Sequence, residues 1–404
     1  MTGHSSLLRR RFLQLTATTA LTGCADDPGG RYTAADIQQL EDQRTSEQQK
    51  RGKGRHGPQV YQGYRGLAEL PWFDLDREDR LVCIDDSFPR AIDVHCHLGI
   101  SVLFEPHLDL LATTPRVRHL LDCDATDPGS PLDLDIYING NFSESQLSDL
   151  RLNTLAQGLW GSPFASTQTI PNLLAEMDAM RVEHALLLPI KLGLPFGDAL
   201  TENWRTAVAK AKANERLHPG LSVLPTHPQA STQMIDLSQS GAPIVKLHPT
   251  VQRFYPDDPR VMPLYELAGE LGLVVFFHGG RAGIEPKSSH RYAMPRHYEA
   301  PLAEFPKTQF ILGHGGARDG AAMLQLGARY DNAWLGLHGQ GVSRLEDIIQ
   351  RTGGERLLFG SDWPFYHLGA TLAKVLIVTN DPSRRTLRER ILRDNALSLF
   401  PAMA

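Results

Sequence analysis

The feature that most constrains the fold is a series of eight short apolar runs, most of them followed by a polar turn and a helical pattern. Such nearly continuous apolar segments are typical of strands buried on both faces of a parallel sheet. The runs span residues 90–95, 184–189, 220–225, 243–247, 273–278, 309–313, 332–337 and 356–361, and helical patterns span 172–182, 200–214, 261–271, 317–326 and 343–351. This alternation predicts an α/β fold, a (β/α)8 TIM barrel, rather than a doubly wound open sheet, which would usually have fewer strands.

Two long insertions follow predicted strands one and five, at residues 98–183 and 279–307. Because both follow strands, we expect them at the catalytic end of the barrel, as lids or substrate walls. Asn139-Gly140 in the first insertion predicts a hairpin turn. The barrel is assigned to residues 81–404.

The chain before the barrel has a different texture. Residues 25–65 are rich in polar residues and predict a flexible tether with one short helix near residues 33–49. Residues 1–24 contain RRRFLQ, which resembles a twin-arginine export motif, and LTGC, which resembles a lipobox. We therefore expect twin-arginine export to the periplasm or cell surface, with a lipid anchor at Cys24. No run of 18 apolar residues occurs, so the expected membrane contact is that anchor alone.

Charge and cysteine content narrow the expected partners. The net charge is −5 without a long run of one sign, which argues against nucleic acid and leaves a small-molecule substrate. Besides Cys24, the chain has Cys83, Cys96 and Cys123, an odd number that implies no complete disulfide framework. Pairing of Cys83 with Cys123 stays open.

Polar side chains gather at the ends of the predicted strands. Strand one ends in AIDVHCH, where alternation points His95 and His97 to one side and Cys96 to the other. With 16 histidines in 404 residues, a single HxH pair is unremarkable. Four further strands also end in polar groups, namely Lys246 with His248, His278, His314 and Asp362. Because strand ends meet at one mouth of a barrel, the set predicts a site for zinc or another divalent ion.

These motifs also carry a resemblance to the amidohydrolase superfamily. AIDVHCH, VKLHP, FFHGG, ILGHGG, FGSDWP and ILRDNALSLF are similar, in order and spacing, to the amidohydrolase-related branch. That branch includes aminocarboxymuconate semialdehyde decarboxylase, γ-resorcylate decarboxylases and lactone hydrolases. The resemblance covers about residues 91–401.

The resemblance implies a ligand set for one divalent ion, zinc in the first place: His95, His97, His278 and Asp362. Asp362 and His314 would be catalytic, with Asp362 accepting the proton of water and His314 assisting the reacting group. A second ion is the alternative if Lys246 is carboxylated, because superfamily members with two metals bridge them through such a lysine. For His248, a satisfied histidine at a loop start and a site role are equally supported.

The favoured activity is a metal-dependent hydrolase, in which metal-activated water attacks an ester, lactone or amide carbon. The alternatives are a non-oxidative decarboxylase of aromatic or unsaturated acids, which would use the same ligands, and a non-catalytic binding lipoprotein. Arg291 and Arg296 could bind a substrate carboxylate. Structural roles are favoured for His227 and His338. A homodimer is compatible with the resemblance, since barrels of this branch often pair.

Overall fold

Eight parallel strands form the centre of the molecule. The computed structural model describes residues 30–404 apart from 100–107, 120–130, 150, 153–164 and 195–197. The strands are β4 (Ala91–Cys96), β6 (Val182–Leu187), β7 (Leu217–Pro219), β8 (Ile244–Leu247), β9 (Val274–Phe277), β10 (Phe310–Leu312), β11 (Ala333–Gly336) and β12 (Leu357–Leu358). They pair in chain order as β4-β6-β7 and as β8-β9-β10-β11-β12.

Backbone hydrogen bonds join these two sheets at both seams. Between β7 and β8, Leu221 N donates to Ile244 O at 2.9 Å, and Lys246 N donates to Leu221 O at 2.8 Å. Between β12 and β4, Val94 N donates to Phe359 O at 3.1 Å. The strands therefore form the predicted (β/α)8 barrel, whose ring leaves no open sheet edge.

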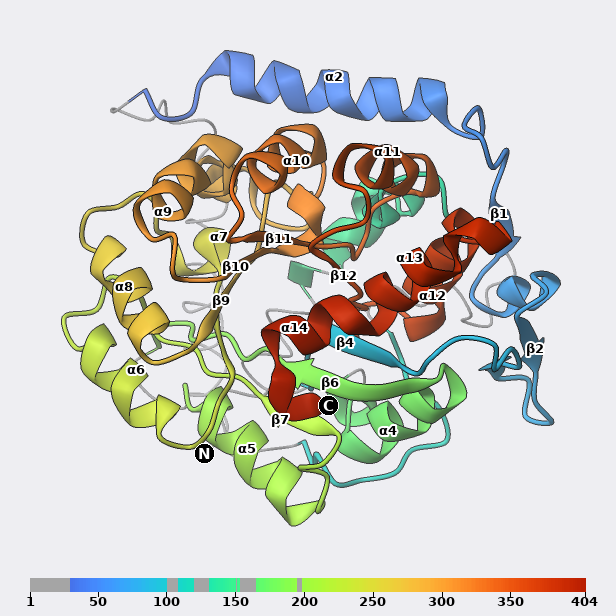
Figure 1. Cartoon of the computed structure of the whole chain (residues 1–404), viewed down its shortest axis with the longest axis horizontal. Coiled ribbons are helices and arrows are strands. Elements are labelled where there is room, and N and C mark those ends of the chain that lie inside the picture. Colours follow the sequence, from blue (N-terminus) through green and yellow to red (C-terminus); the bar gives the residue numbers. More distant parts are fainter. Residues whose placement is uncertain (1–29, 100–107, 120–130, 150, 153–164, 195–197) are drawn as a thin grey trace, which may run out of the picture.

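A ring of helices surrounds the strands (Figure 1). The ring contains α4 (Ile170–Ala179), α5 (Leu200–Lys210), α6 (Ala230–Ser238), α8 (Met262–Glu270), α9 (Glu299–Glu304), α10 (Gly320–Arg329), α11 (Val342–Thr352) and α12 (Leu368–Val378). Shorter elements outside the ring are α7 (Pro249–Gln252), α13 (Arg385–Glu389), α14 (Asn395–Leu399), β2 (Phe73–Leu75) and β3 (Leu81–Cys83).

Helix α11 shows how the sequence sets these elements. Its buried residues include Leu345, Ile348 and Ile349, whose spacing places them on one face of a helix. The helix ends at Gly353, which has φ 65° and adopts the left-handed conformation that glycine accepts without a Cβ clash. The apolar face therefore packs inward, and the glycine lets the chain turn into β12.

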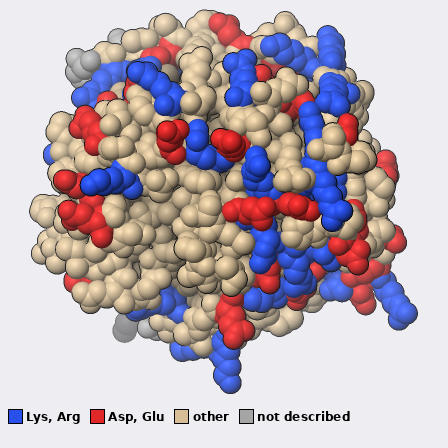
Figure 2. All heavy atoms as spheres, viewed as in Figure 1, with Lys and Arg blue, Asp and Glu red and all other residues tan. Residues whose placement is uncertain are grey.

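The amino-terminal end of the barrel is closed by the end of the chain. Ile92, Ile244 and Val274 lie at the starts of their strands and pack in one cluster with Phe400 and Met403. Figure 1 shows α14 lying across this end. In the same view, Figure 2 shows basic and acidic side chains intermingled around it.

Two predicted strands differ from the observed ones. Strand three was predicted at 220–225, but β7 lies at Leu217–Pro219, because the half-buried His218 hides the start of the strand from an apolar pattern. Leu221 instead forms an isolated bridge with Val245. The last strand was predicted at 356–361, and only Leu357–Leu358 pair as β12.

The prediction of a hairpin turn at Asn139-Gly140 is wrong. These residues lie in the short 3-10 helix η2 (Ile138–Asn141). The preceding strand β5 (Pro131–Asp133) pairs antiparallel with β1 (Val60–Gln62), a segment far away in sequence. A local turn signal could not reveal this long-range pairing.

Residues before the barrel lie against it. The predicted short helix is present as α2 (Ala34–Lys50), and Arg318 Nη1 donates to Glu47 Oε2 at 3.0 Å. Further along, Gly52 N donates to Asp135 Oδ2 at 2.8 Å. The sequence predicted a flexible tether over residues 25–65 and none of these contacts. The contacts are made by polar groups, and Leu40 is the buried residue of α2, so no apolar pattern marks this helix as packed against the barrel.

Two sequence expectations involve residues outside the described ranges. Residues 1–24, with Cys24, are among them, and so is Cys123, the suggested partner of Cys83. Within the described part of the chain, no helix is both long and apolar enough to cross a membrane.

Candidate metal centre

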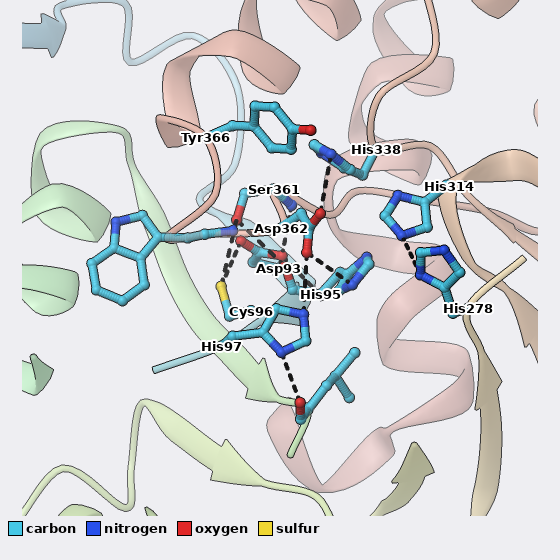
Figure 3. Close-up of polar contacts among 12 residues, drawn as sticks. Asp93, His95, Cys96, His97, His278, His314, His338, Ser361, Asp362 and Tyr366 are labelled. Atoms are coloured by element: carbon cyan, nitrogen blue, oxygen red, sulfur yellow. Dashed lines mark hydrogen bonds and ion pairs between the residues drawn. The ribbon is translucent and has the colours of Figure 1, made fainter. Parts of the chain in front are cut away.

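The carboxylate of Asp362 meets two imidazoles at the mouth of the barrel (Figure 3). His95 Nε2 lies 3.2 Å and His97 Nε2 lies 3.1 Å from Asp362 Oδ1. All three residues are buried. His95 lies near the end of β4 and His97 directly follows the strand, whereas Asp362 follows β12. Closure of the barrel therefore brings together residues separated by more than 260 positions.

The chain after β12 is shaped to present Asp362. Asp362 has φ 60°, a left-handed conformation that aspartate adopts more readily than most residues, and its backbone N donates to His95 O at 2.7 Å. A Cβ at Gly360 would lie 2.9 Å from His95 Cβ. The glycine therefore allows the loop to pass close to β4, and the turn then directs the carboxylate at the histidines.

Asp93 supports the same junction from below. Its Oδ1 accepts from the backbone N of His95 at 2.9 Å and of Ser361 at 3.0 Å, while Cys96 Sγ donates to Oδ2 at 2.9 Å. Burial raises the pKa of Asp93 to about 6. Sequence reasoning missed this residue, although a carboxylate inside the apolar run AIDVH was a usable signal.

The tautomer of His97 follows from its hydrogen bond. His97 Nδ1 lies 2.7 Å from Leu188 O, and a carbonyl oxygen only accepts, so Nδ1 carries the proton. The Nε2 lone pair then faces Asp362. Metal-ligating histidines commonly donate their other ring N–H in this way, which fixes the orientation of the ring.

His278 and His314 form a second contact at the mouth. His314 Nε2 lies 3.0 Å from His278 Nδ1, so one ring donates and the other accepts. His248 stacks on His278 with ring centroids 4.0 Å apart. Burial lowers the pKa of His314 to about 3 and that of His278 well below its usual range. Because burial outweighs the opposing attraction of the Asp362 carboxylate at His314, both rings are neutral at pH 7.

The donor atoms fit a divalent ion. One ligand atom each from His95, His314 and Asp362 lie within 4.8 Å of one another, and His97 Nε2 meets the same carboxylate oxygen. Neutral imidazoles and a carboxylate suit zinc and similar ions. The sequence predicted His278 as a metal ligand and His314 as a catalytic residue that does not bind the metal. In the structure, His314 belongs to the compact donor group, and His278 contacts His314.

Lys246 lies inside the barrel near these residues. Its side chain is buried, and Nζ has no hydrogen-bond partner among the described residues. It lies 4.2 Å from the centre of the Phe276 ring. Burial lowers its pKa to about 7. A buried amine with this pKa is readily neutral near pH 7, as carboxylation or a nucleophilic role would require.

His338 belongs to the site although its sequence context favoured a structural role. Its Nε2 lies 3.5 Å from Asp362 Oδ2, and its ring centroid lies 4.7 Å from that of Tyr366. His338 lies two residues after the end of β11, and His97 similarly lies just after the end of β4. The signal was present in the sequence, but a lone LHG offered no reason to prefer it over other histidines.

The two predicted arginines have other contacts. Arg291 Nε donates to Ser288 O at 3.1 Å within the short helix η4 (Lys287–Ala293). Arg296 donates to both oxygens of Asp36 on α2, at 2.9 and 3.0 Å. Arg296 therefore binds Asp36 on α2 and not a group of the metal centre.

Comparisons with known proteins agree with this architecture. An uncharacterized TIM-barrel protein from Bordetella bronchiseptica is 23% identical, over 63% of this chain and 91% of that one, with a TM-score of 0.51. A 5-carboxyvanillate decarboxylase from Sphingomonas paucimobilis is 17% identical, over 77% of this chain and 99% of that one, also with a TM-score of 0.51. These likenesses concern the fold. No curated protein matches the chain.

A family model described as Amidohydrolase matches residues 92–402. The match begins inside β4 and ends beyond α14, so it includes all eight barrel strands and every residue of the metal centre described above. The chain therefore belongs to the amidohydrolase family, a group of TIM-barrel enzymes that are mostly metal-dependent hydrolases or decarboxylases.

Proposed function

We propose that this protein is a metal-dependent hydrolase acting on an ester, lactone or amide carbon. The observation that carries the proposal is the position of Asp362, with one oxygen facing His95 and His97 and the other facing His338. A carboxylate held in this way can accept a proton from water and pass it on. A bound divalent ion, zinc in our proposal, would lower the pKa of water and polarise the carbonyl of the substrate.

The histidines divide the work of holding and moving protons. His97 keeps its Nδ1 proton on Leu188 O, which leaves Nε2 free as a ligand atom. The neutral His278–His314 pair has one shared proton position between Nδ1 and Nε2, 3.0 Å apart. A proton taken up by one ring can pass across this contact and leave from the other ring to a leaving group, which returns both rings to the neutral state.

One ion per chain is our proposal, because the part of the chain that the structure describes contains one compact donor group, His95, His314 and Asp362. A second ion would require a carboxylated Lys246. Elemental analysis of the purified protein separates these alternatives. About one equivalent supports the single-ion site, and about two equivalents would place Lys246 among the ligands.

Decarboxylation is the second candidate, and the buried amino group of Lys246 favours it. With a pKa of about 7, Nζ is protonated in part of the molecules near neutral pH, and in that form it can attract a substrate carboxylate or supply a proton to carbon. The neighbour from Sphingomonas is named as a decarboxylase. Incubating the protein with a panel of aromatic acids and lactones, while measuring carbon dioxide and acid release, distinguishes the two. Carbon dioxide without hydrolysis would overturn the hydrolase proposal.

The site assignment is tested with His97→Ala. We expect loss of bound zinc together with hydrolysis, because His97 Nε2 is one of the converging donors. His218→Ala is the matched control, since His218 lies on β7 and contacts His184 rather than the metal centre. Full activity and full metal content in His97→Ala would show that the site is assigned wrongly.

We further propose that the protein is exported and lipid-anchored. RRRFLQ and LTGC support this proposal, since two independent signals occur in the expected order. Cell fractionation of wild type and Cys24→Ser tests it. We expect the membrane fraction to contain the wild type and the soluble periplasmic fraction to contain the variant; cytoplasmic wild-type protein would contradict export.

A further inference from the structure

The loops that carry His278 and His314 are in backbone contact. Gly280 has φ 70°, and a Cβ there would lie 1.8 Å from Gly316 O, so no larger residue fits between the loops. Each loop begins at one of the two histidines. The separation of the loops therefore sets the 3.0 Å contact between His278 Nδ1 and His314 Nε2.

A buried ion pair joins the same two loops. Asp319 Oδ2 accepts from the backbone N of Arg281 at 3.0 Å and from its Nε at 2.9 Å, and Oδ1 accepts from Nη2 at 2.6 Å. Their side chains are 0% and 1% exposed. Arg281 comes three residues after His278, and Asp319 comes five residues after His314. This pair therefore links the two loops through side chains that lie close in sequence to both histidines.

Helix α2 covers the ion pair from outside. Arg281 Nη1 donates to the backbone O of Asp36, and Arg281 Nη2 donates to Gln39 Oε1 at 3.4 Å. Gln43 Nε2 donates to Asp319 Oδ1 at 3.5 Å. Figure 1 shows α2 running along the outside of α10 and α11. The helix also lies before residue 92, where the family match begins.

We propose that Arg281 is a positioning residue for the metal centre, and that α2 completes its binding site. Through Asp319 it fixes the two loops, and through them the placement of His278 and His314. The proposal rests on the metal site of the proposed function. It makes the segment before the barrel a working part of the centre rather than a spacer.

Arg281→Lys tests this role. Lysine keeps the positive charge but replaces a three-nitrogen fork by a single nitrogen, so it cannot reach Asp319 and Asp36 as arginine does. We expect a chelator to extract Co²⁺ or Zn²⁺ about 10-fold faster or more, because residues supporting metal ligands typically change affinity by 10–100-fold. We also expect a changed visible absorption spectrum of bound Co²⁺, which reports ligand geometry.

Arg384→Lys is the matched control. Arg384 binds both oxygens of Glu346, at 2.6 and 2.7 Å, and also a backbone carbonyl, Val378 O, at 2.7 Å. The substitution removes comparable hydrogen bonds at a place that contacts none of the histidines of the centre. We expect its thermal stability to fall, with the Co²⁺ spectrum and release rate unchanged.

A double variant, Gln39→Ala with Gln43→Ala, tests α2 at positions where misfolding is not expected. It should speed metal release only about threefold, because both hydrogen bonds are long, at 3.4 and 3.5 Å, and therefore weaker than those within the ion pair. Wild-type release and spectrum in both Arg281→Lys and the double variant would overturn the proposal. If Arg281→Lys does not fold, the double variant decides.

The readout separates this proposal from the proposed function. A protein that binds Co²⁺ but hydrolyses nothing defeats the hydrolase, and the release rates still decide the role of Arg281. A protein that binds no metal overturns both.

Discussion

The two ends of the eight barrel strands differ in residue type: one end carries ionisable side chains and the other carries apolar ones. At the mouth, His95, His97, His278, Lys246 and Asp362 are all buried. At the other end, apolar side chains from the strand starts pack against residues of the C-terminus, Phe400 and Met403 among them. One scaffold therefore separates chemistry from stability, as is general for TIM barrels.

The difference has an energetic side. Among the described residues, buried atoms without a hydrogen-bond partner include His95 Nδ1, Lys246 Nζ, His278 Nε2 and His314 Nδ1. Leaving such atoms unpaired destabilises a fold by about 1–3 kcal/mol each. Arg181 Nε and Arg356 Nε, beside the starts of β6 and β12, also lack a partner among the described residues, but they do not belong to a group of converging metal donors. A ligand bound at the mouth would satisfy the unpaired nitrogens there.

The largest expected effect is at the mouth, from Asp362→Asn. The amide keeps the size of the side chain but cannot accept a proton as the carboxylate does, so kcat/KM should fall about 10³-fold. The apolar end is untouched, and thermal unfolding should stay close to wild type. Steady-state kinetics measures the expected loss of kcat/KM, and calorimetry measures the expected thermal stability. A large loss of stability with retained activity would show that Asp362 serves the stability of the fold rather than the chemistry.

Phe400→Ala is the converse change. It leaves a cavity at the closed end, and we expect the free energy of unfolding to fall by about 3 kcal/mol. Below the unfolding transition, kcat/KM should equal that of wild type. Urea denaturation measures the loss, with Ile84→Ala as a control, because Ile84 is 58% exposed. A fall in kcat/KM at full folding would show that the two ends are coupled.

Stability at acid pH should depend on Glu176 of α4, whose carboxylate contacts Trp363 in the segment just after Asp362. Burial opposes its ionisation, but the charges of His367 and His119 outweigh burial and lower its pKa from 4.5 to about 2. A lowered folded-state pKa stabilises above the unfolded value, and this contribution is lost as the pH falls from about 4.5 toward 2. Glu176→Gln should remove about 2 kcal/mol of that pH dependence.

Urea denaturation of wild type and Glu176→Gln between pH 3 and 7 tests this expectation. Parallel curves would contradict it. Glu176 also accepts from Trp363 Nε1 at 3.1 Å and from Leu368 N at 2.8 Å, so the variant has a stability loss at every pH as well.

The smallest effect is expected at His338. It lies 3.5 Å from Asp362 Oδ2, a looser contact than those of His95 and His97. His338→Ala should lower kcat about tenfold while leaving the metal content unchanged, because the converging donors remain. Metal analysis with steady-state kinetics checks this. Loss of the metal would add β11 to the ligand-bearing strands.

The fold was largely readable from the sequence, because barrel strands are short apolar runs and the helices between them carry an apolar face. The errors are physical. At β7 a half-buried histidine interrupts the apolar pattern. At β5 the partner strand β1 lies about 70 residues away, beyond any turn signal. The contacts of α2 are hydrogen bonds of polar residues, which have no periodic signature.

The sequence by itself determined which strand ends carry imidazole, amine and carboxylate, since alternation and strand position follow from local pattern. It could not determine which of those groups touch. Only the tertiary structure placed His338 on Asp362, grouped His314 rather than His278 with His95, and put Asp93 beneath the junction. It also drew Arg296 to Asp36 and set Arg281 against Asp319. The physical reason is that chain pattern fixes the direction of a side chain, whereas barrel closure and loop packing fix the distances on which ligation and proton transfer depend.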